Sequence, residues 1–386
     1  MTASPALPRL ARWRVLAELG LRMMLHDKAK LVGTLMGVIF AVVLGVQQLS
    51  ILFGLLQKNT MFIDNSAADL WIVPPGTTTL QTGGLMSDGV LARARSTEGV
   101  ALAEPLLFQT ATLKKPSGGT EPVTLVGTSL PARLGGPWNF VAGGPEVLEQ
   151  PDTVVFEDSE REKYGGLDVG SVRELAGQRV RVGGFTWGLL PFGPAYAFTE
   201  LGHARDLTGV PADKMSFVLV KVRPGQDVDA VKARLAERIP ELTVVTRSEY
   251  SRSVVITLLK EQLGASFATS TSFGLIIGFV IVALSMFSSV LDNLREFGTL
   301  KAIGCTNLDL ALLLFCQAAL YALAGSLIGL GLVGQMAEGI RGPKLVPIVP
   351  PVLLAIVPAL MLVVCVVAST LALSRIRKLE PGMVFR

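Results

Sequence analysis

Four long stretches of this sequence contain no charged side chain: residues 31–57, 262–291, 310–337 and 345–374, each at least 27 residues long. At a rise of about 1.5 Å per residue, a helix of that length exceeds the roughly 30 Å hydrocarbon core of a bilayer. The alternative is a buried helix of a large soluble protein, but helices in such proteins run only about 8–20 residues. The low charged fraction, 17% against roughly 25% in soluble domains, agrees with membrane burial. The sequence therefore predicts four membrane-spanning helices.

The first stretch is expected to stay in the mature protein as an anchor. It begins about thirty residues into the sequence, and it is far longer than the roughly 7–15 residue apolar region of a signal peptide. It also lacks a clear small-residue cleavage site after it.

The distribution of charges predicts which ends of the spans face the cytoplasm. Residues 59–261 contain 20 Lys and Arg against 24 Asp and Glu, whereas the rest of the chain contains 15 against 7. Lys and Arg near the ends of a span favour the cytoplasmic side, and both termini carry the surplus. Both termini are therefore expected in the cytoplasm, as four spans require. Because the basic residues flank the membrane and do not cluster on the large domain, no nucleic-acid partner is expected.

The predicted fold is an α-helical membrane protein with four transmembrane helices and a large α+β extracytoplasmic domain inserted between helices 1 and 2. The expected segments are a cytoplasmic N-terminal amphipathic helix (1–30), the first span (31–57), a periplasmic α+β domain with a stalk (58–261), the second span (262–291), a cytoplasmic elbow (292–309), the third span (310–337), a short periplasmic loop (338–344), the fourth span (345–374) and a cytoplasmic tail (375–386).

The N-terminal segment is expected to form a helix that lies on the inner membrane surface. Its apolar residues recur at helical spacing, with Arg12, Arg22 and His26 on the opposite face, and they are Leu10, Trp13, Ala17, Leu21 and Met24. The alternative is an ordinary amphipathic helix that packs on protein.

The large domain combines short β-rich runs with many Gly and Pro residues. Candidate strands are 69–73, 123–127, 154–156, 179–182 and 217–222. Residues 228–239 have helical spacing and lie between the last of these strands and a further run at 242–245, which predicts a strand–helix–strand unit. From Ser248 a helix is expected to continue into the second span, because no Pro or Gly occurs before Gly264.

No catalytic motif is recognisable in this chain. It contains no phosphate-binding G-x-x-x-x-G-K-[ST] loop, no H-E-x-x-H and no G-x-S-x-G. Its two isolated histidines, His26 and His203, predict no metal site, and His203 is expected at the surface. Since the predicted spans also contain no ionisable side chain of the kind that ion-coupled carriers use, an ion-coupled carrier is disfavoured. We expect no catalytic residue, no metal and no cofactor in this chain, and an energy source on a partner protein.

Three G-x-x-x-G pairs occur in the predicted spans, and such pairs allow helices to approach closely. They are Gly33 with Gly37, Gly274 with Gly278, and Gly325 with Gly329. Tight packing within the chain or in a dimer is expected at these positions.

The elbow at 292–309 is the most informative segment. Leu294, Phe297, Leu300 and Ile303 recur at helical spacing among charged residues, and Gly304 is expected to end this short helix. A charged amphipathic helix between two spans indicates a docking surface, although a simple polar turn fits the same pattern.

The residues of this elbow resemble a known family. The stretch R-E-F-G-T-L-K-A-I-G-C-T at 295–306 resembles the R-E-I-G-x-L-x-A-x-G-A-x signature of MacB/FtsX-like ABC transporter permeases, and residues 377–386 resemble the family's R-x-x-P-x-x-A-L-R ending, with Val-Phe in place of Ala-Leu. The chain is more similar to the DevC-like subgroup, through its length and the A-D-L-W stretch in 68–76.

This resemblance implies a homodimeric permease in a bacterial inner membrane, each copy of which binds a separate cytoplasmic ABC ATPase subunit. ATP and Mg²⁺ would bind to that partner. The coupling residues implied by the motif are Arg295, Glu296, Phe297, Gly298, Leu300, Lys301 and Gly304. DevC-like systems also imply a periplasmic adaptor, or membrane fusion protein, and an outer-membrane channel. The resemblance favours export or extraction of a substrate by mechanotransmission; the alternative is an FtsX-like regulator that activates a periplasmic enzyme without transporting a solute. The resemblance does not identify the substrate among lipid, lipoprotein, haem, drug and peptide.

Overall fold

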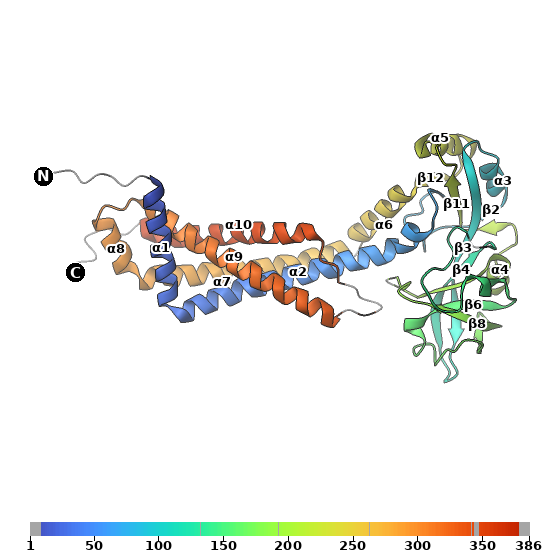
Figure 1. Cartoon of the computed structure of the whole chain (residues 1–386), viewed down its shortest axis with the longest axis horizontal. Helices are drawn as coiled ribbons and strands as arrows, with labels where there is room; N and C mark the ends of the chain where they lie inside the picture. Colours follow the sequence, from blue (N-terminus) through green and yellow to red (C-terminus); the bar gives the residue numbers. More distant parts are fainter. Residues whose placement is uncertain are drawn as a thin grey trace. The chain divides into compact units, whose positions relative to one another are not determined.

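The computed structural model describes residues 9–131, 133–191, 193–261, 263–340, 342 and 347–377. Within these residues the chain forms two compact units (Figure 1). A helical unit lies within 9–53, 265–340 and 347–377, and an α+β domain lies within 54–264. Helix α2 contributes to both units, because its residues up to Phe53 pack in the helical unit and those from Gly54 pack in the domain.

The helical unit contains the apolar runs that the sequence predicts as membrane spans. Among the described residues, four helices are long and apolar enough to cross a membrane, and they lie at Lys28–Asn65, Leu263–Asp292, Asn307–Gly339 and Pro351–Ala372. The helices of this unit are α1 (Arg9–His26), α2 (Lys28–Asn65), α7 (Leu263–Asp292), α8 (Leu294–Ala302), α9 (Asn307–Ile340) and α10 (Pro351–Arg377). The predicted α-helical membrane architecture is confirmed. The first spanning helix, α2, extends beyond the uncharged run 31–57 at both ends.

Helices α2 and α7 pack along an antiparallel interface. Residue numbers increase along α2 while the numbers of their contact partners decrease along α7. The contacting pairs are Lys30 with Asp292, Thr34 with Ser285, Gly37 with Ile281, Ala41 with Gly278, Leu44 with Gly274, and Gln48 with Ser270. Helix α9 contacts α2 where Gly325 faces Val38 and Gly329 faces Val42, so α9 runs parallel to α2. Small residues and short polar contacts thus replace a hydrophobic driving force between helices that lipid surrounds.

Helix α1 packs against α9. Met24 is buried, and Gln317 Nε2 donates a hydrogen bond to the Gly20 carbonyl oxygen at 3.1 Å. Leu21, which the helical spacing groups with Met24, is instead 41% exposed, as is its neighbour on the next turn, Leu25, at 53%. The face of α1 that contacts α9 passes through Gly20 and Met24, and the placement of α1 on the inner membrane surface stays a prediction.

The domain begins with an α/β layer. Strands β1 (Leu70–Val73), β3 (Val100–Lys114), β11 (Phe217–Val222) and β12 (Thr243–Thr246) lie in the order β12-β1-β11-β3, with β1 antiparallel to both of its neighbours. Helices α3 (Gly89–Arg95) and α5 (Val228–Arg238) contribute buried residues to one cluster with these strands. The predicted strand–helix–strand unit is confirmed as β11-α5-β12, although β1 separates its two strands.

The second half of the domain is a closed ring of strands. The pairings among the described residues run β3-β4-β9-β6-β8-β7 and return to β3, and apolar residues from all six strands form one buried cluster. The remaining elements are β2 (Met86–Ser87), β4 (Thr120–Thr128), β5 (Phe140–Ala142), β6 (Thr153–Glu157), β7 (Val172–Leu175), β8 (Gln178–Thr186), β9 (Tyr196–Glu200), β10 (Lys214–Met215), α4 (Leu201–Thr208), α6 (Arg247–Glu261) and the short 3₁₀ turns Pro145–Glu149 and Asp158–Glu160.

Two expectations for the domain need correction. The 15-residue strand β3 was not predicted, because Glu104 and Pro105 interrupt its apolar pattern. His203 is not a surface residue: its side chain is only 13% exposed, and its Nδ1 lies 3.6 Å from Asp152 Oδ1. The expected continuity of α6 with α7 falls on Gln262, outside the described residues.

Candidate functional site

The elbow between α7 and α9 folds as a short helix with a defined end. Helix α8 spans Leu294–Ala302, and Gly304 follows it with a φ of +103°. The Gly304 N–H bonds to the Lys301 carbonyl, and the Cys305 N–H bonds to the Leu300 carbonyl at 3.0 Å. This is a Schellman motif, in which only glycine takes the left-handed position without strain. Gly304 therefore ends the helix, as its position in the sequence predicts.

One face of α8 anchors the helix to the bundle. Phe297 is 2% exposed and belongs to the core cluster of the helical unit, Gly298 is buried beside it, and Leu294 and Leu300 pack partly against the same cluster. Ile303, which the helical spacing places on this apolar face, is 77% exposed. Ile303 keeps a helical backbone conformation, and its N–H bonds to the Thr299 carbonyl at 3.0 Å, so it still follows the helical face. Its exposure shows instead that the described residues leave this end of the face uncovered.

The other face of α8 is open. Arg295, Glu296 and Thr299 are exposed, and Lys301 is half-buried at the edge of this face. Beyond the helix end lie two large apolar side chains, Ile303 and Leu308, the latter 82% exposed. The elbow thus presents charged residues next to two exposed apolar ones.

Polar contacts hold the elbow in place on both sides. Lys30 Nζ pairs with Asp27 Oδ2 at 3.0 Å and also contacts Asp292, the last residue of α7. On the other side, Thr306 Oγ1 donates to Asp309 Oδ2 at 2.7 Å, and the Thr306 N–H donates to the same oxygen at 2.8 Å. This arrangement at the start of α9 satisfies orphan N–H groups of the helix. The elbow is therefore fixed to the first turns of its neighbouring helices.

The glycines predicted for helix packing lie mostly at helix contacts. A Cβ added at Gly37, Gly278, Gly325 or Gly329 would overlap a side chain of the facing helix, and one at Gly274 would lie in ordinary contact, 3.5 Å from Leu44 Cβ. Gly33 differs, because it has no heavy atom within 4 Å of its added Cβ and is exposed. Among the residues that the structure describes, none packs against Gly33.

Metal chemistry finds no support in the part of the chain that the structure describes, where no three His, Cys, Asp or Glu residues group as metal ligands. Most of the predicted motif at 377–386 lies outside the described residues.

Two family models match the chain. The model of the MacB-like periplasmic core domain matches residues 31–238, more than half of the chain, and that of the FtsX-like permease C-terminal domain matches residues 269–381, which include the elbow. The chain belongs to the MacB/FtsX-like family of ABC transporter permeases. It is accordingly a multi-pass membrane protein.

Individual relatives of the permease are distant. An uncharacterised ABC transporter permease of Methanocaldococcus jannaschii is 25% identical over 139 residues, which are 33% of each chain, so the match spans a third of that relative's length. Among solved structures, the periplasmic region of MacB from Actinobacillus actinomycetemcomitans is 9% identical over 52% of this chain and 97% of that one, with a TM-score of 0.40. The extracellular domain of the noncanonic ABC-type transporter YknZ from Gram-positive bacteria is 13% identical over 46% and 98%, with a TM-score of 0.34.

Sequence reasoning missed two parts of the permease's elbow. The contact between Lys30 and Asp292 joins residues 262 positions apart, and no local pattern predicts such a pair. The exposure of Leu308 was also not predicted, although the sequence places Leu308 in the 292–309 elbow, outside the apolar run.

Proposed function

We propose that this permease binds a separate cytoplasmic ATPase subunit through the elbow, and that ATP-driven movement of that subunit is transmitted to the α+β domain on the other side of the membrane. The proposal rests on the amphipathic character of helix α8, which has one buried face and one exposed charged face. Its inner face is buried through Phe297, while its outer face offers Arg295 and Glu296. Because α8 is anchored to the helical bundle and exposes a charged face, movement of a protein bound to that face would be transmitted to the bundle.

The chain's own chemistry supports a non-catalytic role. The sequence contains no phosphate-binding loop, so ATP and Mg²⁺ would bind to the partner. Both termini and the elbow would face the cytoplasm of a bacterial inner membrane, since the basic surplus flanks the first and last spans. A homodimer would bring two ATPase subunits together, and a periplasmic adaptor and outer-membrane channel would complete an exporter.

The elbow can be tested in the complex of the permease with its ATPase, reconstituted in lipid vesicles. We expect Glu296→Ala with Lys301→Ala, and separately Ile303→Asp, to weaken ATPase binding at least tenfold or to abolish the permease's effect on ATP turnover. Val141→Asp is the matched control for Ile303→Asp, because Val141 is an exposed apolar residue (55%) in the α+β domain. Wild-type binding and turnover in both elbow variants would show that the elbow is not the coupling element.

The same complex separates export from the alternative, regulation of a periplasmic enzyme. Export predicts that ATP turnover responds to a small hydrophobic or lipidic compound. Regulation predicts that it responds only to a protein bound at the α+β domain.

A further inference from the structure

Two helices enter the α+β domain and end on one buried aromatic cluster. Helix α2 contributes Phe62, whose ring centroid lies 5.4 Å from those of Phe108 and Tyr196. Helix α6 contributes Tyr250, whose ring lies 5.3 Å from that of Trp71. Trp71 also contacts Phe62 at 6.3 Å, so this β1 residue touches both helices. All five rings are buried, and side chains packed at the density of a protein interior transmit displacement.

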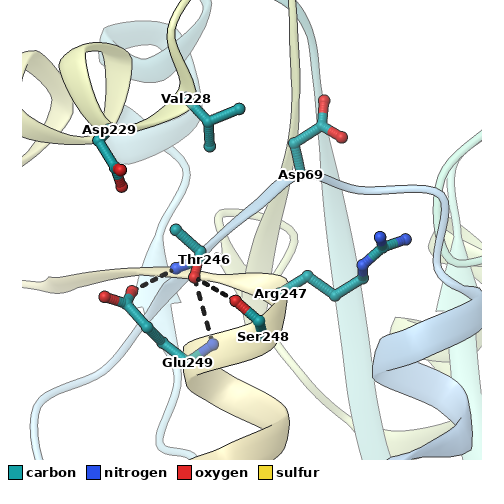
Figure 2. A pocket seen from close by; sticks show the side chains of 7 residues that line it. All are labelled: Asp69, Val228, Asp229, Thr246, Arg247, Ser248 and Glu249. Carbon is teal, nitrogen blue, oxygen red and sulfur yellow. Dashed lines mark hydrogen bonds between the residues drawn. The ribbon is translucent and has the colours of Figure 1, made fainter.

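Helix α6 starts directly from a strand, with no loop between them. Strand β12 ends at Thr246 and α6 begins at Arg247, and no Gly or Pro occurs from Thr243 to Glu261. Figure 2 shows Glu249 reaching back over the first turn, where its Oε2 accepts from the Thr246 N–H at 2.8 Å, while the Glu249 N–H donates to Thr246 Oγ1 at 3.2 Å. This reciprocal capping box fixes the direction in which the helix leaves the strand.

Glu249 also ties α6 to the helix that covers the sheet. Lys232 Nζ, on α5, lies 2.6 Å from both carboxylate oxygens of Glu249, and this pair holds the pKa of the Glu249 carboxyl below its usual range. The Arg247 N–H bonds to the Asp69 carbonyl at 3.1 Å, next to β1. An open hollow of about 460 Å³ borders these contacts, lined by Asp69, Val228, Asp229, Thr246, Arg247, Ser248 and Glu249 (Figure 2).

A direct contact joins the two entering helices. Ser251 Oγ, one turn into α6, donates to Asp64 Oδ1 at the end of α2 at 2.7 Å. After α2, the Ser66 carbonyl accepts from the Gly135 N–H at 2.9 Å, which fixes the chain as it leaves the helix.

We propose that these contacts form a rigid joint, made of Phe62, Asp64, Trp71, Glu249, Tyr250 and Ser251, that makes α2 and α6 move as one body with the sheet. Glu249 is its main positioning residue, because it lies on α6 and its carboxylate binds both β12, through the Thr246 N–H, and α5, through Lys232. Hinges in proteins are loop or element-terminal residues that absorb large changes in φ and ψ. Here no loop separates β12 from α6, and the capping box between Thr246 and Glu249 fixes the element-terminal residues at which the two join. This inference rests on the proposed function, since a rigid joint matters for function only if α2 and α6 transmit movement to the domain.

The joint can be tested by measuring distances between spin labels in the permease–ATPase complex, with Cys305, Cys316 and Cys365 replaced by Ala. Two label pairs report on the joint: Gln57→Cys with Lys260→Cys, on α2 and α6, and Lys260→Cys with Ser117→Cys, on α6 and the β3–β4 turn. We expect neither distance distribution to shift between the nucleotide-free complex and the complex trapped with ATP and vanadate. A shift in either pair would overturn the rigid joint.

A third measurement separates failure of the joint from failure of the proposed function. Ser117→Cys alone, in complexes with one label per copy, reports the distance between the domains of the proposed homodimer. If that distance does not respond to ATP, transmission of movement fails, whatever the joint does. If it responds while the pairs within one copy stay constant, both proposals stand.

Glu249→Ala provides the perturbation, and Glu174→Ala is its matched control. Glu174 is also paired with a lysine, Lys114, at 3.0 Å, and the two glutamates are exposed to a similar degree, 43% and 48%. We expect Glu249→Ala to broaden the Lys260–Ser117 distribution and to reduce the ATP response between copies at least twofold, with Glu174→Ala matching the wild type. An unaltered distribution in Glu249→Ala would show that Glu249 does not position α6.

Discussion

Replacing Glu157 by alanine is expected to lower the free energy of unfolding of the α+β domain by about 2–6 kcal/mol. Glu157 is fully buried at the end of β6, and its carboxylate accepts hydrogen bonds from the Gly188 N–H at 2.7 Å and the Leu189 N–H at 3.1 Å. It also accepts from Thr186 Oγ1 at 3.1 Å. The Gly188 carbonyl in turn accepts from Lys58 Nζ of helix α2 at 2.8 Å. The carboxylate therefore holds the segment that α2 touches.

The magnitude follows from the donors that the substitution would leave without an acceptor. Thr186 and Leu189 are fully buried, and each unsatisfied buried donor costs about 1–3 kcal/mol, which gives about 2–6 kcal/mol for the two. Gly188 is half-buried, so water can reach its N–H and it is left out of the sum. The sum is a large part of the roughly 5–15 kcal/mol that stabilises a typical domain. The control is Glu162→Ala, a nearby exposed glutamate, which we expect to change stability by no more than about 0.5 kcal/mol.

The assay is urea unfolding of the purified permease in detergent, followed by tryptophan fluorescence, with hydrogen exchange of residues 186–189 measured in parallel. Trp187 lies inside this segment and is 44% exposed, so its emission reports release of the segment. If Glu157→Ala unfolds within about 1 kcal/mol of the wild type, the network does not hold the segment and the reasoning is refuted.

The pH dependence gives a second readout of the same residue. Burial raises the pKa of the Glu157 carboxyl above its usual range, and the hydrogen bonds it accepts only partly oppose this. The folded state then keeps the proton at pH values where the unfolded chain has lost it, so this group's contribution to stability falls as pH rises from the unfolded to the folded pKa. Glu157→Gln removes this contribution. The stability difference between wild type and Glu157→Gln should therefore shift against the wild type as pH rises from about 4 towards neutrality; a difference independent of pH would contradict the raised pKa.

Two further predictions concern the membrane helices and the topology. Gly278→Leu should lower the thermal stability of the helical unit by about 1–3 kcal/mol, because an added side chain overlaps Ala41 on α2, whereas Gly33→Leu, with open space around it, should not; equal melting temperatures for the two variants in detergent would argue against close packing of α2 on α7. A cysteine at Ser117, exposed in the turn between β3 and β4, should react with a membrane-impermeant thiol reagent in intact spheroplasts, and protection until the membrane is opened would place the domain on the cytoplasmic side.

Local sequence patterns are sufficient to predict the membrane-spanning helices, the position of the α+β domain between the first two of them, and the elbow helix that ends at Gly304. These features depend on local patterns: an uncharged run needs no partner to reveal its length, and the preference of Gly304 for a left-handed φ is intrinsic to the residue. The unit β11-α5-β12 was predictable for the same reason, since its alternation and helical spacing are complete within 217–246.

Contacts between residues far apart in the sequence are seen only in the folded chain. Phe62 and Tyr250 are 188 positions apart and lie in one aromatic cluster, and Glu157 finds its donors some thirty residues away in 186–189. The long strand β3 was hidden because Glu104 and Pro105 break its apolar pattern, and Glu104 is tolerated there since the Leu134 N–H bonds to its carboxylate at 2.9 Å. The exposure of Ile303 and the isolation of Gly33 were equally invisible, because periodicity gives the face on which a residue lies but not whether another element covers that face.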